Sequence, residues 1–309
     1  MQTAMISSPD PAMQTALLIL PNFALIVVGL ALARRFQFGR DFWAGLEKLV
    51  YYVLFPALLF RSLAIARIDF ATAAAPIAVA LGFTFAGFLL SIAAGPALRL
   101  ERRLNAAGSQ CGYRFNTYVG LAVAGSLYGT PGVAMAALLL GVMIPEANVF
   151  AVAMLARHGE RGFLHELATH PLLVSSVAGL AWNLAGLPLP GFADQTLNLL
   201  GTTALPAGLL SVGAAMRIEK GQGPVAAHAW WLVVKLAIVP AIAWGAIHEL
   251  GIVGVQARTL LLCAALPTAT NAYILAVRMT GDGRAVATQV TIGTVLSMLT
   301  LPVWMSVPL

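Results

Sequence analysis

Long apolar stretches alternate with short polar segments along the whole chain. A helix needs about 20 apolar residues to cross the hydrocarbon core of a membrane, and runs of this length recur from end to end. They are continuous, rich in Leu, Ala and Val, and lack the period-two alternation of barrel strands. We therefore predict membrane-spanning helices. Their approximate ranges are 13–35, 41–63, 71–98, 106–128, 131–155, 164–187, 194–216, 225–249, 256–279 and 286–307.

The composition excludes the other broad classes of protein. Hydrophobic residues make up 60% of the 309 positions and charged residues 10%, whereas soluble domains carry about 25% charged residues. Disorder requires low hydrophobicity, and two cysteines cannot support a disulfide scaffold. The sequence thus predicts an all-α polytopic membrane protein. It contains no nucleotide-binding loop. An intramembrane enzyme would need a clustered nucleophile and base, or metal ligands, and the five histidines are scattered, so we expect no enzyme activity, no cofactor and no metal.

Basic residues are concentrated on one side of the predicted spans. Loops on the side of the N-terminus carry three of them, and loops on the other side carry twelve. The three are Arg61, Arg67 and Arg258, and the twelve are Arg34, Arg35, Arg40, Arg99, Arg102, Arg103, Arg157, Arg161, Arg217, Lys220, Arg278 and Arg284. Cytoplasmic loops carry the excess of Lys and Arg. We therefore expect both termini outside, periplasmic or extracellular. Charges spread over five short loops do not suggest a nucleic-acid surface.

The two halves of the chain resemble each other at a spacing near 150 residues. Pro21 precedes Pro171 by 150 residues, and Pro56 precedes Pro206 by the same distance. The element NTYVGLAV around Asn116 lies 155 residues before NAYILAV, which begins at Asn271. Five spans in each half would invert the second copy, and inverted repeats are typical of secondary transporters that bind substrate near the membrane midplane. Chance similarity among apolar helices is the alternative.

The two asparagines lie near the middle of the fourth and ninth spans. Pro267 precedes Asn271 by four residues and is expected to break the helix there. In the first copy Gly112 and Gly120 flank Asn116. Backbone groups freed by a broken helix need protein or water partners at membrane depth. The asparagines could supply them, bind a ligand, or simply bond a neighbouring helix. Half-helix N-termini carry partial positive charge and suit an anion.

Five segments resemble the auxin efflux carrier family of bacterial permeases, which is related to the bile-acid symporters. They are FPALLFRSLA, FNTYVGLAVAGSLYG, HPLLVSSVAGL, LPAGLLSVGAAMR and LPTATNAYILA. The resemblance covers nearly the whole chain. It implies ten transmembrane helices in two inverted five-helix repeats, residues 1–155 and 164–309, joined by a short cytoplasmic linker at 156–163. Helices 1, 2, 6 and 7 would form a scaffold, helices 3–5 and 8–10 a transport domain, and helices 4 and 9 would cross as broken helices.

The resemblance also implies site residues and an assembly. Asn116, Asn271 and Pro267 match the crossover positions, and Asn148 matches a polar position that lines the substrate pocket. Homodimers joined through the scaffold are expected. The related plant auxin carriers have an acidic residue on the third helix that supports the site, but span 71–98 has no Asp or Glu. The long cytoplasmic loop of many plant members is also missing.

Few charged residues remain inside the predicted spans. Each is costly at membrane depth and is therefore a candidate functional residue. Glu146 could carry a coupling proton or pair permanently with a cation such as Arg114. Arg114 could meet a substrate carboxylate or extend toward the cytoplasmic headgroups. Lys235 is expected to face the bundle interior with an unknown partner. Lys48, with Glu47 beside it, can reach the interface.

The sequence thus predicts a secondary transporter in a bacterial inner (plasma) membrane. Its expected substrate is a small organic anion, carboxylate or auxin-like, bound where the two broken helices cross and moved by alternating access. Tyr118 and Tyr273 accompany the asparagines and could flank the pocket, although aromatic packing explains them equally well. Coupling to protons or to sodium stays open. The alternatives are a sodium-coupled symporter of the bile-acid-transporter type and a ligand-sensing receptor.

Overall fold

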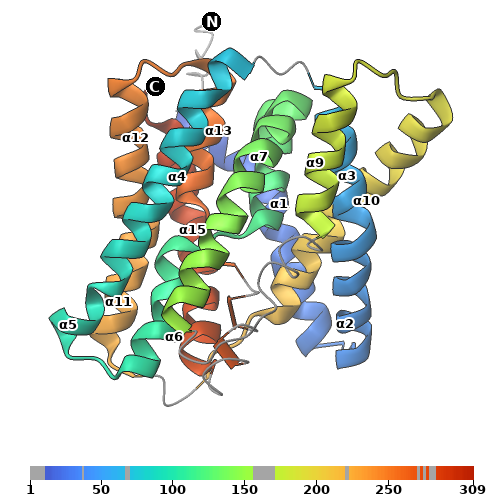
Figure 1. Cartoon of the computed structure of the whole chain (residues 1–309). Helices are drawn as coiled ribbons and strands as arrows, with labels where there is room; N and C mark the ends of the chain where they lie inside the picture. Colours follow the sequence, from blue (N-terminus) through green and yellow to red (C-terminus); the bar gives the residue numbers. More distant parts are fainter. Residues whose placement is uncertain are drawn as a thin grey trace, which may run out of the picture.

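The protein is helical throughout the part of the chain that the structure describes (Figure 1). The computed structural model describes residues 11–36, 38–66, 70–155, 171–219, 223–269, 272–273, 276–277 and 283–309. Within these ranges seven helical segments are long and apolar enough to cross a membrane. Two shorter apolar helices, Pro171–Leu184 and Gly254–Ala265, accompany them. The chain is therefore an all-helical, multi-pass membrane protein.

The first half contains eight helical elements. They are α1 (Pro11–Arg34), α2 (Arg40–Leu49), the π-helical turn η1 (Val50–Leu54), α3 (Phe55–Ala64), α4 (Phe70–Ile92), α5 (Ala94–Leu98), α6 (Arg102–Tyr113) and α7 (Thr117–Leu155). The long α7 folds back on itself at Gly129, whose φ of 60° and ψ of −151° suit glycine alone. Pro131 follows at the start of the second arm, where its missing amide proton costs nothing.

The second half contains α9 (Pro171–Leu184), α10 (Gly191–Ala215), α11 (Val225–Val233), the π-helical turn η2 (Val234–Ile238), α12 (Val239–Glu249), α13 (Gly254–Ala265) and α15 (Arg284–Ser306). Pro240 lies two residues after the end of η2 and cannot donate to the carbonyl of Leu236 four residues earlier. The indole nitrogen of Trp304 on α15 donates to that carbonyl instead, at 2.9 Å. The irregular turn is thus satisfied by a neighbouring helix.

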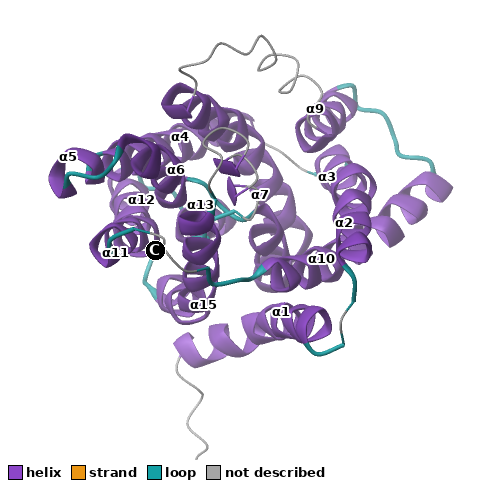
Figure 2. Cartoon of the chain, turned by 90° about the horizontal axis from the view of Figure 1, so that it is seen from below, coloured by secondary structure: helices purple, strands orange, loops and turns teal. Residues whose placement is uncertain are grey.

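The helices form two groups. Seen along the bundle in Figure 2, α1, α2, α3, α9 and α10 lie on one side, and α4, α6, α11, α12, α13 and α15 lie on the other. In the first group α1 packs against α10, and α3 packs against both α9 and α10. In the second group α4 packs against α6 and α12, and α13 packs against α15. The helix α7 contacts members of both groups.

Two close helix crossings in the first group are related by an offset of 150 residues. A Cβ atom added to Gly29 on α1 would collide with the backbone of Leu210 on α10. A Cβ atom added to Gly179 on α9 would likewise meet the backbone of Phe60 on α3. Gly179 lies 150 residues after Gly29, and Leu210 lies 150 residues after Phe60. The same close approach of two backbones therefore occurs twice. The first half supplies the glycine in one crossing, and the second half supplies it in the other.

The basic residues of the described loops and helix ends separate between the two ends of the bundle. The last residues of α1 and α5 and the first residues of α2, α6, α11 and α15 lie at the lower end in Figure 1. The end of α3 and the start of α13 lie at the upper end. The lower set is Arg34, Arg35, Arg40, Arg99, Arg102, Arg103, Arg217 and Arg284, against Arg61 and Arg258 at the upper end. Arg67, Arg157, Arg161, Lys220 and Arg278 lie outside the described residues.

Candidate functional site

The first helix break separates α6 from α7. The helix α6 ends at Tyr113, and residues 114–116 are not helical before α7 begins at Thr117. Asn116 caps the new helix because its side-chain Oδ1 accepts the backbone amides of Tyr118 at 3.1 Å and Val119 at 3.2 Å. Amide protons in the first turn have no partner inside the helix. The polar side chain at the break thus restarts the helix.

Gly112 and Gly120, which flank Asn116 in the sequence, lie in the helices on either side of this break. The non-helical residues contain neither glycine nor proline, and the two glycines serve close packing. A Cβ atom at Gly112 would collide with the side chain of Ser91 on α4, and one at Gly120 would press against Leu266. The helix stops at Tyr113 because its freed backbone groups find better partners across the crossing.

The second break follows α13, where the sequence predicted it. The helix α13 ends at Ala265 and residues 266–269 are not helical. Pro267 lies within this segment, is buried, and cannot donate an amide hydrogen bond. Residues 272–273 and 276–277 are helical again. Asn271 lies outside the described residues.

The two breaks are bonded to each other. The backbone amide of Asn116 donates to the carbonyl oxygen of Pro267 at 2.8 Å. The hydroxyl of Thr268 donates to the carbonyl oxygen of Cys111 at 2.7 Å, which lies in the last turn of α6. A helix leaves its last carbonyls without internal partners. Each break therefore satisfies backbone groups that the other leaves open, and the crossing is one connected unit.

The Nδ2 donor of Asn116 has no hydrogen-bond partner among the residues that the structure describes. Asn116 is only 3% exposed, and both amides that its Oδ1 accepts belong to α7. Its Nδ2 group is buried and makes no hydrogen bond. An unsatisfied buried donor costs about 1–3 kcal/mol, so native proteins rarely keep one without a reason. The side chain thus caps α7 through its oxygen and presents a dry NH₂ group at the crossing.

Arg114 lies two residues before this side chain and connects two amide side chains, the buried Gln110 and the partly buried Asn148. Its Nη2 donates to Oδ1 of Asn148 on the second arm of α7 at 2.9 Å, and its Nη1 donates to Oε1 of Gln110 at 3.3 Å. Arg114 is itself buried, so it does not extend to the headgroups. The structure therefore brings together Arg114, Asn116 and Asn148, three of the residues proposed from the sequence.

Glu146 does not neutralise Arg114. The structure describes both residues and forms no ion pair between them. One oxygen of the carboxylate, Oε2, is buried and accepts no hydrogen bond. Glu146 lies on the second arm of α7, two residues before Asn148. The permanent Arg114–Glu146 pair is thus absent. Oε2 of Glu146 remains free to accept a hydrogen bond, and Glu146 lies two residues before Asn148, which accepts from Arg114.

Lys235 lies on η2 and faces the bundle interior, as predicted. It is 2% exposed, and its Nζ donates to the carbonyl oxygen of Ala264 at 3.2 Å. Ala264 lies in the last turn of α13. The partner that the sequence could not identify is therefore a backbone carbonyl at the broken end of the other helix.

The two tyrosines pack elsewhere. The ring of Tyr118 stacks on Phe55 of α3, with centroids 4.6 Å apart and planes 10° from parallel. The ring of Tyr273 lies under the guanidinium of Arg217, which is 4.0 Å from its centroid. Tyr118 thus packs on an aromatic ring and Tyr273 on a guanidinium group, and Tyr118 joins α7 to the first helix group.

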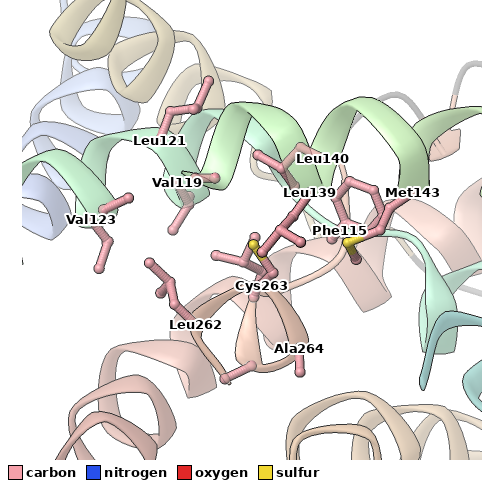
Figure 3. Close-up of a cluster of buried hydrophobic side chains, with 14 of the residues drawn as sticks. Phe115, Val119, Leu121, Val123, Leu139, Leu140, Met143, Leu262, Cys263 and Ala264 are labelled. Atoms are coloured by element: carbon pink, nitrogen blue, oxygen red, sulfur yellow. The ribbon is translucent and has the colours of Figure 1, made fainter. Parts of the chain in front are cut away.

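Apolar side chains enclose the crossing. Figure 3 shows Phe115, Val119, Leu139, Leu140 and Met143 on the break and on both arms of α7, facing Leu262 and Cys263 on α13. All of these residues are buried. In such a low-dielectric setting each polar contact is stronger than in water. The same packing shields Asn116, so a ligand reaches it only if the helices move.

Two site residues were missed by sequence reasoning. Gln110 is fully buried and holds Arg114, and Thr268 bonds the first break to the second. Gln110 carries a readable signal because it lies four residues before Arg114, on one helix face. Thr268 depends on a contact 157 residues away along the chain. Among the described residues, no three His, Cys, Asp or Glu side chains gather as metal ligands.

Comparisons with known proteins indicate what kind of protein the chain is similar to. Residues 157–305 match the family model described as membrane transport protein. A protein named "Putative malonate transporter" from Rhizobium meliloti is 27% identical over 305 residues, covering 92% of each chain. An uncharacterized transporter from Methanothermobacter thermautotrophicus is 30% identical over 134 residues, 43% of this chain and 44% of its own. Another uncharacterized transporter, from Methanocaldococcus jannaschii, is 23% identical over 202 residues, which cover 60% of this chain and 63% of its own. The comparisons confirm the resemblance to auxin efflux carrier permeases and support a role in membrane transport.

Proposed function

We propose that this permease, which is of the auxin efflux carrier type, carries small organic anions across the membrane by alternating access, with its binding site at the crossing of the two breaks. The observation that carries the proposal is the unpartnered Nδ2 of Asn116. It is a buried donor, held in place because Oδ1 of the same side chain caps α7. A substrate oxygen arriving there gains a hydrogen bond without breaking another.

The charges around the crossing favour an anion. The N-terminus of α7 begins at Thr117 and carries partial positive charge. The guanidinium of Arg114 lies three residues before it and is positioned by Gln110 and Asn148. Together with Nδ2 of Asn116, these groups offer donors and positive potential to a carboxylate.

We place ten crossings in the chain. The seven long segments include one stretch, Arg102–Ala151, that turns back at Gly129 and therefore counts twice. The shorter helices α9 and α13 add two more. Residues 1–155 and 164–309 are then two five-helix repeats. The paired crossings of Gly29 with Leu210 and of Gly179 with Phe60 support their relation by inversion.

The two helix groups suggest the moving parts. We assign α1, α2, α3, α9 and α10 to a scaffold and the remaining helices to a transport domain that carries the crossing. The site is dry in this conformation because Asn116 is 3% exposed. Displacement of the transport domain against the scaffold would open the crossing to one side and then to the other. The stacked pair of Phe55 and Tyr118 lies on this boundary.

Malonate is the first substrate to test, since it is a small dicarboxylate and a relative over 92% of the chain bears its name. Purified protein in liposomes should accumulate radiolabelled malonate and exchange it against unlabelled malonate, while empty liposomes should not. Succinate, acetate and indole-3-acetate as competitors would define the anion class. Binding without any flux would instead favour a receptor.

The charge distribution suggests an orientation in the membrane, and the exposed apolar side chains suggest an assembly. The lower end in Figure 1 carries the excess of basic residues, so we place it in the cytoplasm of a bacterial inner (plasma) membrane, with both termini outside. We expect a homodimer through the scaffold, whose described helices expose apolar side chains such as Leu17, Val177 and Leu199. Accessibility of a cysteine placed after Leu309 to a membrane-impermeant reagent tests the orientation.

A further inference from the structure

We propose that the ammonium group of Lys235 is a built-in cation, which fills a monovalent-cation position at the C-terminal end of α13, so that the crossing works without sodium. The proposal goes beyond the choice of transported anion. It concerns which ion holds the broken helix together.

The position itself suits a cation. The helix α13 ends at Ala265, and residues 266–269 leave the helix, so its last carbonyl oxygens have no amide partners within it. These oxygens lie at the negative end of the helix dipole. Discontinuous helices of transporters use such half-helix C-termini and unwound carbonyls to coordinate coupling cations. A free carbonyl oxygen buried at this helix end would favour a cation beside it.

Lys235 already occupies this position. Its Nζ donates to the carbonyl oxygen of Ala264 at 3.2 Å, and the side chain is 2% exposed. Among the described residues no carboxylate forms an ion pair with it. An ammonium group has three donors, of which one bonds the carbonyl oxygen of Ala264; this carbonyl and the negative end of the α13 dipole favour a positive charge at this position. A primary ammonium and a sodium ion can both occupy such a position because each is a monovalent cation that carbonyl oxygens stabilise, the ammonium through as many as three directed hydrogen bonds and sodium through direct coordination.

The other break has a neutral counterpart. There the carbonyl of Cys111, in the last turn of α6, accepts a hydrogen bond from the hydroxyl of Thr268. The helix α4, which packs against α6, contains no charged residue. The donors bonded to the helix-end carbonyls thus differ in kind, a neutral hydroxyl at α6 and an amino group at α13, although the guanidinium of Arg114 also follows the end of α6. We infer from the buried amino group on the carbonyl of Ala264 that Lys235 takes the place of an ion there.

Substitution of Lys235 removes the amino group from its position beside the carbonyl of Ala264. The Lys235→Ala variant leaves the carbonyl of Ala264 in place and opens room for an ion. The Lys235→Met variant is similar in length but neutral, so it fills the space and admits none. Lys48, an exposed residue of α2, provides the control in the variant Lys48→Ala.

The experiment is thermal unfolding of the purified full chain in sodium chloride and in choline chloride at equal ionic strength. Wild type and Lys48→Ala should melt at the same temperature in both salts. Lys235→Ala should melt lower in choline chloride and recover by about 3 °C or more in sodium chloride, because an ion that binds only the folded state stabilises it. Ammonium chloride should restore it as well, whereas Lys235→Met should respond to neither salt.

Two results would overturn the proposal. One is a sodium-specific rise of the melting temperature in the wild type, which would also favour the bile-acid-type symporter. The other is a Lys235→Ala variant that folds and ignores both sodium and ammonium. If that variant does not fold, equilibrium binding of ²²Na⁺ to the wild type decides: bound sodium contradicts the proposal and its absence supports it. No readout involves the anion, so the proposed transport function can fail independently.

Discussion

The backbone amide of Asn116 donates a hydrogen bond of 2.8 Å to the carbonyl oxygen of Pro267. The two residues are 151 positions apart, and each lies in the break of its own helix. Neither break can shift without disturbing the other. The crossing is therefore expected to move as one body during transport, with the donor Nδ2 of Asn116 carried on it.

Arg114 should be needed for anion affinity as a guanidinium and not merely as a charge. The Arg114→Lys variant keeps the positive charge but cannot bond Gln110 and Asn148 together in a fixed fork. We expect at least about tenfold weaker malonate binding, measured by titration calorimetry in detergent. Arg102→Gln, at an exposed position at the start of α6, serves as the control and should bind as the wild type does. Unchanged affinity in Arg114→Lys would remove Arg114 from the site.

Glu146 should carry the coupling proton. Its Oε2 is buried without a partner, so protonation would cost it no existing hydrogen bond. The Glu146→Gln variant mimics the protonated form permanently, and we expect the pH dependence of malonate uptake into proteoliposomes to flatten. Glu101→Gln, at the exposed start of α6, should leave that dependence unchanged. A Glu146→Gln variant with the wild-type pH profile would exclude this role.

The paired helix crossings should be equally sensitive to added volume. Gly29→Ala and Gly179→Ala each place a methyl group against a neighbouring backbone, and overpacking typically costs about 1–3 kcal/mol. We expect a similar drop in melting temperature for both. Gly82→Ala on α4 is the control, because a Cβ there meets nothing within 4 Å, and alanine favours a helix. If only one of the two variants is destabilised, the crossings are not equivalent.

Local chemistry made part of the crossing predictable. Pro267 broke its helix as expected because the missing amide proton and the ring clash act on the preceding turn. The other break fell at residues 114–116, which contain neither proline nor glycine, and backbone groups at this break are bonded to the other half of the chain. Such contacts leave no periodicity in the sequence. For the same reason the carbonyl partner of Lys235 and the packing of Tyr118 and Tyr273 could not be read in advance.

The most direct test of the anion site separates the two roles of Asn116. Serine is as good a helix cap as asparagine, so Asn116→Ser keeps an acceptor for the amides of α7 but removes the Nδ2 donor. The account predicts a melting temperature near that of the wild type together with malonate binding weakened at least about tenfold, since one lost buried hydrogen bond to a charged ligand is worth about 1.5–3 kcal/mol. A folded Asn116→Ser protein that binds malonate with wild-type affinity would contradict it.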